Sequence, residues 1–508
     1  MPDRYHGYNA SVGYTAHFFP EMAPDLLDFC IREQRFEPQR SSERSYRYLD
    51  LGCGQGFHLC LLAAANPEAE FVGVDFQDDH IAHGRELANA GGLANVRFLQ
   101  ADFLDLAAAW PAELGTFDYV ALQGILSWIS PQLRDAVFQC VAHASGPGTL
   151  SVFGYNSQPG WLSVTPFQHI ANQFGKTANP ETALRGAITM FQRLRQLKAP
   201  LLEQLPRFKG HLDTITTKST SYLAHEYLTD NWTALWHSSV ARDLESVSLT
   251  YLGTASIAET MLPYSLAPEL RDIILQQPPG PLRQDVQDIV IDQSFRRDIF
   301  CRDPRPSDSA SARVGATPIY LFSPPVDGEL VRFTTKFGEL TISYAGIADI
   351  LAAVADGPKS FAELVALENP VRPHTRSILL SMLHSGILVV GKDASASAKT
   401  AQRFNGAIAR SAAAGITYEY VAAAALGSGI PVSELELLLL DTWLSSDGEI
   451  DQAALVHGVA NRLRALGRQL HFRGNTIADD QLESQIAHLG QMFFERALPL
   501  WRRLGVLE

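Results

Sequence analysis

The chain has 508 residues, of which 46% are hydrophobic and 19% are charged, and its formal net charge is -14. This length predicts two to four domains, because one hydrophobic core cannot serve so many residues. The acidic balance and the absence of a basic run argue against binding to nucleic acid, since phosphate binding requires clustered Lys and Arg.

The cysteines and the lengths of the apolar runs indicate the cellular compartment of the protein. The five cysteines are an odd number and form no CxxC pair, which predicts a reducing compartment, no disulfide framework and no zinc site. No stretch of about 18 apolar residues occurs, so we expect no membrane insertion. The start of the chain, MPDRYHGYNA, has no apolar signal region. We therefore expect a cytoplasmic protein that holds no metal.

Short apolar runs alternate with helical stretches over the first third of the chain. A helix begins at Ser130-Pro131, where a capping residue precedes a proline in the first turn. Strands alternating with helices predict a parallel sheet covered on both faces. The strands are expected at 46–51, 71–74, 96–100, 117–122 and 149–155.

The pattern changes after residue 161. Residues 162–244 are helical in pattern and show no regular strand spacing, and strand-like runs then return at 246–257 and 295–302. We expect these two runs to be the last pair of strands of the same sheet, with the helical stretch inserted before them.

The second half is divided by composition. Residues 303–316, DPRPSDSASARVGA, have the composition of a linker. A hairpin with Gly338 at its turn, a capping box at Ser360 to Glu363, and a helix at 374–384 leading into a strand predict a winged-helix-like module. A second linker at 392–401 precedes a mostly helical remainder, in which the apolar run 435–440 is expected to be buried.

A glycine-rich loop follows the first predicted strand. LDLGCGQG, residues 49–56, has the pattern G-x-G-x-G, which departs from the common G-x-G-x-x-G fingerprint. Bare backbone between a strand and a helix lets amide groups approach a polar ligand. Asp75 ends the next strand 19 residues after Gly56, where an acid can bind ribose hydroxyls. Asp102 and Phe103 could meet an adenine ring; a helix cap at Asp75 and a turn at Asp102 are the structural alternatives.

LDLGCGQG, GVDF and ADF together resemble the class I S-adenosylmethionine-dependent methyltransferases. In that family the glycine loop meets the methionine part of the cofactor, the second-strand acid holds the ribose and the third-strand acid lies by the adenine amine. The resemblance implies a Rossmann-like sheet that binds S-adenosylmethionine and releases S-adenosylhomocysteine. The residues that it assigns to the cofactor are Asp50, Gly52, Gly54, Gly56, Asp75, Phe76, Asp102, Phe103 and Gln123.

A finer resemblance extends over almost the whole chain. GILSWISPQLR (124–134), YNSQPGW (155–161) and YLAHEYL (222–228) resemble bacterial methyltransferases with a methyltransferase regulatory domain. That group includes rickettsial protein lysine methyltransferases that act on outer-membrane protein. The resemblance implies a homodimer, with the helical insertion helping to form the interface, and an amine acceptor such as protein lysine.

Candidate acceptor residues follow the fourth and fifth strands, because ligands bind outside the carboxyl ends of the strands in open α/β sheets. We predict that Tyr155 and Tyr14 position the acceptor and that Asn156 and Trp128 line the site. Loop packing is the alternative for Trp128 and Trp161. The aromatic stretch that contains Tyr8, Tyr14, Phe18 and Phe19 is either a lid over the cofactor or part of the core.

Three other sequence patterns give weaker evidence about function. His225-Glu226 lacks the second His of a zinc motif, since position 229 is Thr, so a structural hydrogen-bonding pair is expected. His374 with its neighbouring arginines is better suited to a protein contact than to DNA. The Asn/Asp-Pro-Pro-aromatic motif typical of amide and nucleobase methylation is replaced by GILSW, which disfavours those acceptors.

The expected fold is α/β, a Rossmann-like class I methyltransferase sheet with a helical insertion, plus a winged-helix-like module and a helical C-terminal domain. A small-molecule N- or O-methyltransferase would have a closed apolar pocket, whereas a protein-modifying enzyme would have an open groove between the insertion and the C-terminal domain. A non-catalytic regulatory protein that binds the cofactor is the third alternative. The expected units are a lid segment (1–45), the cofactor domain (46–161), the insertion (162–245), the last strands with a regulatory helical insert (246–302), the winged-helix-like domain (316–391) and the helical C-terminal domain (401–508).

Overall fold

The computed structural model describes residues 16–39, 41–260, 266–326, 328, 330–372, 374–392, 398–446, 449–468 and 479–508. It also places the backbone of four short strands, β1 (Arg4–Tyr5), β2 (Tyr8–Asn9), β19 (His471–Phe472) and β20 (Asn475–Thr476). Within this described part of the chain, no helix is both long enough and apolar enough to cross a lipid bilayer.

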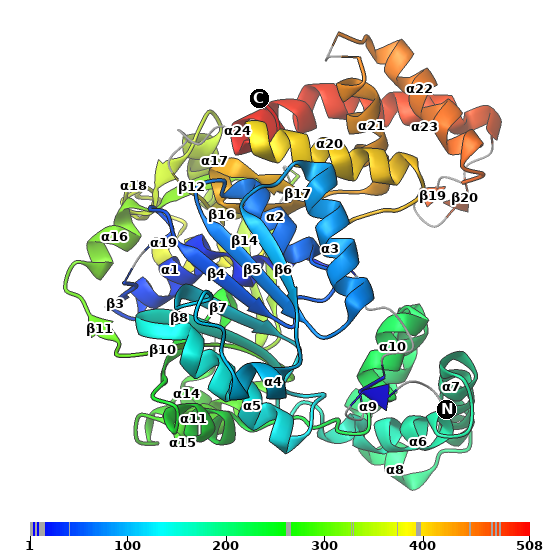
Figure 1. Cartoon of the computed structure of the whole chain (residues 1–508). Helices are drawn as coiled ribbons and strands as arrows, with labels where there is room; N and C mark the ends of the chain where they lie inside the picture. Colours follow the sequence, from blue (N-terminus) through cyan, green and yellow to red (C-terminus); the bar gives the residue numbers. More distant parts are fainter. Residues whose placement is uncertain are drawn as a thin grey trace.

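A seven-stranded sheet in the order β6-β5-β4-β7-β8-β10-β9 forms the centre of the molecule (Figure 1). Its first five strands in the chain are parallel, and β10 runs antiparallel between β8 and β9. The α/β sheet and the late pair of strands are therefore as predicted. The strands are β4 (Arg47–Leu51), β5 (Glu70–Asp75), β6 (Val96–Gln100), β7 (Phe117–Gln123), β8 (Ser145–Asn156), β9 (Thr250–Thr254) and β10 (Phe295–Cys301).

Helices cover both faces of the sheet, so the central parallel strands β4, β5 and β7 are almost entirely buried. Alternate residues of β4 enter different cores: Tyr48 packs with the helices of one face, and Leu49 and Leu51 pack with those of the other. The first face carries η1 (Pro20–Met22), α1 (Pro24–Glu33), α2 (Phe57–Ala65) and α3 (Asp78–Gly91), and the second carries α4 (Phe103–Ala108), α5 (Pro131–Ala144) and α11 (His237–Glu245).

The helical insertion has a hydrophobic core of its own. It lies beyond one end of the sheet, away from the C-terminal helices (Figure 1), and the short strand β2 lies against its α10. Its helices are η2 (Leu162–Val164), α6 (Thr165–Gly175), α7 (Pro180–Gln196), α8 (Pro200–Gln204), α9 (Pro206–Thr214), η3 (Ile215–Thr217) and α10 (Thr220–Tyr227). Between β9 and β10 the chain forms α12 (Ile257–Thr260), α14 (Pro268–Leu275) and α15 (Pro281–Ile291).

Residues 303–316 are more ordered than a linker. They form β11 (Arg305–Pro306), which pairs with β3 (Phe36–Glu37), and α16 (Ala310–Ala316). Ala310 and Val314 of this helix are buried, and α16 packs on α1. The linker prediction is wrong here because Ala310 and Val314, one helical turn apart, are buried where α16 packs on α1. Composition alone does not reveal that surface.

The middle region contains the predicted hairpin, capping box and helix-strand unit. Ser360 Oγ accepts from the Glu363 amide, and the Glu363 carboxylate accepts from the Ser360 amide at 2.8 Å. The winged-helix assignment stays a prediction. The elements are β12 (Pro318–Leu321), β13 (Leu330–Thr335), β14 (Gly338–Ser343), η4 (Tyr344–Gly346), α17 (Ala348–Val354), β15 (Lys359–Ser360), α18 (Phe361–Val365), α19 (Thr375–His384) and β16 (Leu388–Val390).

The C-terminal half shares one hydrophobic core with the sheet. Its helix α20 packs on α2 and α3, and the rings of Tyr418 and Phe57 stack with centroids 4.6 Å apart. Residues 393–397 of the second predicted linker, 392–401, lie outside the described residues, and its last three residues, 399–401, are the first turn of α20. The elements are α20 (Lys399–Ala413), β17 (Tyr420–Ala423), η5 (Ala424–Leu426), β18 (Ser428–Pro431), α21 (Glu434–Leu444), α22 (Gln452–Ala465), α23 (Asp479–Met492), the π-helical turn η6 (Phe493–Ala497) and α24 (Leu498–Leu504).

Candidate functional site

The glycine loop between β4 and α2 has a geometry that side chains would obstruct. Gly52 and Gly56 have φ angles of 81° and 75°, in the left-handed region where glycine carries no steric penalty. A Cβ atom on Gly52 would lie 2.4 Å from Ile125 Cδ1, and one on Gly56 would lie 2.7 Å from the Phe98 ring. The amide of Gly52 donates to the Val74 carbonyl at 2.8 Å. The loop is therefore held against the carboxyl end of β5.

Asp75 connects this loop to the start of α3. Its Oδ2 accepts from the Gly54 amide at 3.0 Å, and its Oδ1 accepts from the Gln77 amide at 2.9 Å. His80 Nδ1 lies 3.4 Å from Oδ1. The N-cap residue of α3 is Gln77, so Asp75 does not act as the helix cap. A carboxylate held by two amides is positioned before any ligand arrives.

Asp50 adds a second buried acid beneath the loop. Burial raises the pKa of Asp50 to about 7, and the nearby negative charge of Asp75 acts in the same direction. Asp102 has the simpler role of N-cap of α4, because its Oδ1 accepts from the Leu104 amide at 2.6 Å. A helix cap was expected as the alternative at Asp75 and a turn at Asp102, whereas it is Asp102 that caps a helix; its side chain also borders the cavity described next.

Two adjoining cavities open at this edge of the sheet. The first is bordered by the ends of β5, β6 and β7, and the second lies on the side of η1 and α2; Gly52, Gly54 and Gln123 border both. Every residue that the resemblance assigns to the cofactor borders one or both. Those of the first cavity are Gly52, Gly54, Asp75, Phe76, Asp102, Phe103 and Gln123, and those of the second are Asp50, Gly52, Gly54, Gly56 and Gln123.

The first cavity fits a ligand with a sugar and an aromatic base. Gln123 borders both cavities, and its Oε1 is buried against Gly154, with no hydrogen-bond partner among the described residues. Asp75 supplies an anchored acceptor for hydroxyl groups, while Phe76 and Phe103 supply apolar faces. An anchored hydrogen-bond acceptor between two apolar faces suits the ribose and adenine of S-adenosylmethionine.

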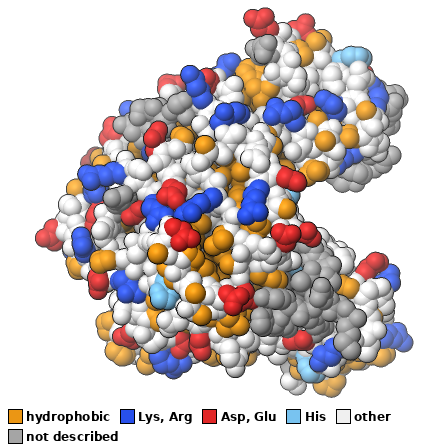
Figure 2. Space-filling model, viewed as in Figure 1, with side chains coloured by type: hydrophobic (Ala, Val, Ile, Leu, Met, Phe, Trp, Pro, Cys, Tyr) orange, Lys and Arg blue, Asp and Glu red, His pale blue; other side chains and the backbone are white. Residues whose placement is uncertain are grey.

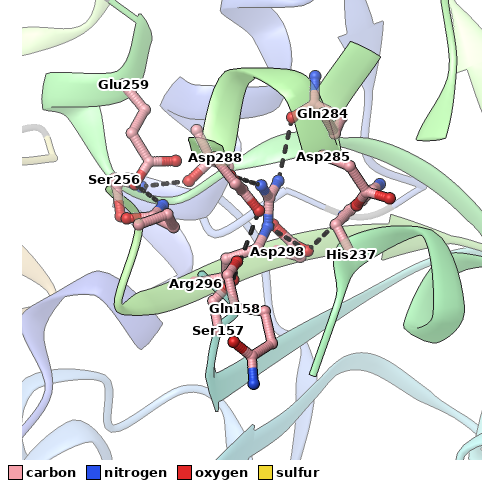
Figure 3. Close-up of polar contacts among 12 residues, drawn as sticks. Ser157, Gln158, His237, Ser256, Glu259, Gln284, Asp285, Asp288, Arg296 and Asp298 are labelled. Carbon is pink, nitrogen blue, oxygen red and sulfur yellow. Dashed lines mark hydrogen bonds and ion pairs between the residues drawn. The ribbon is translucent and has the colours of Figure 1, made fainter. Parts of the chain in front are cut away.

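Trp128 is the predicted acceptor residue that borders the first cavity. Tyr155 and Asn156 border neither cavity, and their contact with an acceptor stays a prediction. The Tyr155 hydroxyl donates to Asp298 Oδ2 at 2.6 Å within a buried network that includes Arg296 and His237 (Figure 3).

Asn156 instead donates through Nδ2 to Glu226 Oε1 at 2.8 Å. The same oxygen accepts from Trp232 Nε1 at 2.9 Å, and burial raises the pKa of Glu226 to about 7. Glu226 therefore works as a hydrogen-bonding group in the structure. Among the described residues, no three His, Cys, Asp or Glu side chains gather closely enough to hold a metal ion.

The aromatic N-terminal stretch is divided between core and cavity. Phe18 is fully buried, whereas Phe19 borders the second cavity. Tyr14, and the side chain of Tyr8, lie outside the described residues. Trp161 donates through Nε1 to the Ser294 carbonyl at 2.7 Å and packs on Trp232, as the packing alternative expects.

Several residues of the cavity were not predicted. Ile125 closes against Gly52, His80 supports Asp75, and Ile129 and Leu133 give the first cavity an apolar wall. The signal for this wall was the apolar run after the fourth strand, GILSWI, which begins at Gly124.

Comparisons with known proteins agree with this geometry. Residues 42–192 match a family described as a methyltransferase domain, and residues 219–302 match a predicted methyltransferase regulatory domain. The structure of PKMT2 from Rickettsia typhi in complex with AdoHcy superposes with a TM-score of 0.72 at 18% identity, over 97% of this chain and 100% of that chain.

Two further similarities come from sequence. An uncharacterized protein of Synechocystis is 26% identical over 98% of this chain and 99% of its own length. A tRNA (guanine-N(7)-)-methyltransferase of Rubrobacter xylanophilus is 44% identical over 55 residues, which is 11% of this chain and 25% of that enzyme. The first similarity extends along the whole chain and the second is local.

Proposed function

Because this chain is a class I S-adenosylmethionine-dependent methyltransferase that carries a methyltransferase regulatory domain, we propose that its acceptor is the side-chain amine of lysine in a protein. The observation that carries the proposal is the extent of the likeness to PKMT2, which includes the insertion and the C-terminal half as well as the sheet. These are the parts of the chain outside the cofactor domain that can select an acceptor.

The shape of the surface supports a large acceptor. The molecule is hollowed between the C-terminal helices and the helical insertion, as the space-filling view makes visible (Figure 2). A protein-modifying enzyme needs such an open approach, whereas an enzyme for small molecules encloses its substrate.

One wall of the first cavity suits an amine acceptor that approaches the bound cofactor. S-adenosylmethionine supplies a methyl group on a positively charged sulfur, so catalysis rests on alignment and on the state of the amine. The apolar wall of Trp128, Ile129 and Leu133 disfavours an ammonium ion, because desolvation lowers the pKa of an amine. The indole face of Trp128 also tolerates the positive charge that develops on the nitrogen. These residues bind and orient the acceptor while they exclude water.

A labelling experiment tests the acceptor class. The full chain is incubated with tritiated S-adenosylmethionine and either a bacterial protein extract or the low-mass fraction of the same extract. We expect label in protein that is recovered as methyl-lysine after hydrolysis, and no label once the lysines of the extract are blocked by acetylation. Label confined to the low-mass fraction would contradict the proposal, and Asp75→Asn serves as the inactive control.

We also propose that the chain forms a homodimer through the helical insertion. Leu197 and Leu201 are 62% and 48% exposed on this unit, and Phe174 is 37% exposed. Apolar side chains gathered on one small unit favour an interface. Light scattering should report a dimer for the wild type and a monomer for Leu197→Glu/Leu201→Glu; a monomeric wild type would refute the proposal.

A further inference from the structure

A third cavity, of about 640 Å³, lies apart from the two cofactor cavities. It is bordered by η1 and α1, by the start of α12 with Arg297 of β10, by the ends of β13, α19 and β16, and by β17 and β18. It shares no bordering residue with the two cofactor cavities. We call it the junction cavity, because four parts of the chain meet there. Its volume falls in the range of small-molecule sites, about 300–1,000 Å³.

A buried carboxylate on the wall of the junction cavity is only half satisfied. Glu259 is 5% exposed, and its Oε1 accepts from Gln293 Nε2 at 2.7 Å and from Lys336 Nζ at 2.9 Å. Its Oε2 is buried with no hydrogen-bond partner among the described residues. Glu259 and Ser256 lie on the opposite side of Arg296 from His237 (Figure 3). An orphaned carboxylate oxygen that is this well enclosed favours a ligand that donates hydrogen bonds.

A donor on the same wall is also unsatisfied. Arg297 Nε has no hydrogen-bond partner within the described part of the chain, while its Nη2 lies 3.3 Å from Glu21 Oε1. The Arg297 carbonyl accepts from the Ala255 amide at 2.8 Å, which places this arginine beside the start of α12 and therefore near Glu259. One wall thus offers a carboxylate oxygen to a cation and a guanidinium nitrogen to an anion.

The remaining lining defines the class of ligand. The charges on this wall balance, since Glu21 pairs with Arg297 and Lys336 pairs with Glu259, and Asp25 lies near Lys392. A ligand without net charge is therefore favoured. The rest of the lining is largely apolar and includes Ile257, Leu388, Val389 and Ile430.

The cavity is also connected to the cofactor site. Pro20 and Glu21 of η1 border the junction cavity, whereas Met22 and the preceding Phe19 border the second cofactor cavity next to the glycine loop. The Met22 carbonyl accepts from the Tyr48 hydroxyl at 3.2 Å, so η1 is held between the two sites. A ligand that engages Arg297 changes the partner of Glu21 on this short helix.

We propose that the junction cavity is an effector site for a free amino acid, whose ammonium group binds Glu259 and whose carboxylate binds Arg297. Binding is coupled to the cofactor site through η1. The inference does not depend on the identity of the methyl acceptor, because its test measures binding alone.

Calorimetry on the full chain tests the site with the twenty free amino acids as probes, each in the presence of saturating S-adenosylhomocysteine so that the cofactor cavities are filled. We expect at least one amino acid to bind, and Glu259→Gln to weaken it about tenfold or more, as loss of a charged hydrogen bond requires. The matched control is Glu269→Gln, an exposed position on α14. Thr334→Trp, at an exposed residue that borders the cavity, blocks the site sterically without removing a buried charge.

Three results would overturn the proposal. One is that none of the twenty amino acids binds the wild type. Another is that binding survives in both Glu259→Gln and Thr334→Trp. The third is that the affinity for S-adenosylhomocysteine is the same with and without the bound amino acid, since coupling by a shared element changes both affinities by one common factor.

Discussion

Removing the Arg296 side chain should cost much of the stability of the part of the sheet in which β10 pairs with β8. Arg296 is fully buried; its Nε lies 2.9 Å from both oxygens of Asp298, its Nη1 donates to Asp288, and its Nη2 donates to Gln284 at 3.0 Å. Figure 3 shows the guanidinium between the two carboxylates. Arg296→Met keeps much of the apolar volume but leaves Asp288 and Asp298 buried without the guanidinium that joins them.

The expected loss follows from these contacts. Breaking a buried ion pair by removing one partner costs about 3–5 kcal/mol, against a total stability of about 5–15 kcal/mol for a domain. The loss should be larger at pH 8 than at pH 5.5. Although burial opposes it, Arg296 and His237 hold the pKa of Asp298 below its ordinary value, so the wild type keeps this carboxylate ionised. Without Arg296 the pKa values of both acids rise, and protonation at lower pH relieves the repulsion.

Hydrogen exchange measures this loss locally, because a chain of several domains need not unfold in one step. Amides of β8 and β10 should exchange faster in Arg296→Met by a factor that corresponds to about 3–5 kcal/mol. The triple variant Arg296→Met/Asp288→Asn/Asp298→Asn should recover most of the protection, since no charge is left buried. A loss below about 1 kcal/mol, or a triple variant no better than the single one, would refute the reasoning.

Three further predictions concern the candidate site. Asp75→Asn should weaken S-adenosylmethionine binding about tenfold to a hundredfold in calorimetry, because a neutral side chain holds the Gly54 amide and ribose hydroxyls less well. The control is Asp79→Asn, at an exposed neighbour on α3, which should leave the affinity unchanged. Equal affinities in the two variants would contradict the assignment of Asp75. Asp50→Asn should gain stability relative to the wild type as pH rises from about 4 to about 7, by up to about 1.4 kcal/mol per pH unit. The pKa of Asp50 is raised to about 7 in the folded state, so over this window the folded wild type keeps a proton that the unfolded chain releases, and unfolding becomes easier as pH rises. Urea unfolding without cofactor at pH 5 and pH 8 checks this, and a difference that does not change with pH refutes it. Tyr155→Phe should lower the hydrogen-exchange protection of β8 by about 1–2 kcal/mol, because the hydrogen bond to Asp298 is lost, and should leave turnover within about twofold of the wild type. A large loss of turnover at unchanged stability would instead support the predicted contact between Tyr155 and the acceptor.

The cofactor side of the site could be predicted from local sequence. The loop from Gly52 to Gly56 and the acid Asp75 follow consecutive parallel strands, and such strands bring their carboxyl ends to one edge of the sheet. No long-range information is needed for that convergence. The orphaned oxygen of Gln123 needed the coordinates, since a hydrogen-bond inventory requires every neighbour.

The acceptor side could not be predicted in the same way. The position of a residue at a strand end predicts the edge of the sheet at which its side chain lies, but not the face to which the side chain points. Tyr155 lies on the same face as Phe153, in the core that includes α11. Its partner Asp298 lies 143 residues away in sequence. The error at 303–316 has a related cause, because the burial of Val314 depends on α1, a helix from the start of the chain.

The shared core of the two halves has a consequence for how the chain folds during synthesis. Every residue of α2, the helix that the glycine loop opens, is buried, and part of its cover comes from α20 and from Tyr418. Those residues leave the ribosome more than 300 positions after α2. The nascent cofactor domain therefore presents an apolar face to the cytosolic folding machinery until translation is nearly finished. Chains stalled before α20 should bind general chaperones, and the ability to bind cofactor should appear late in synthesis.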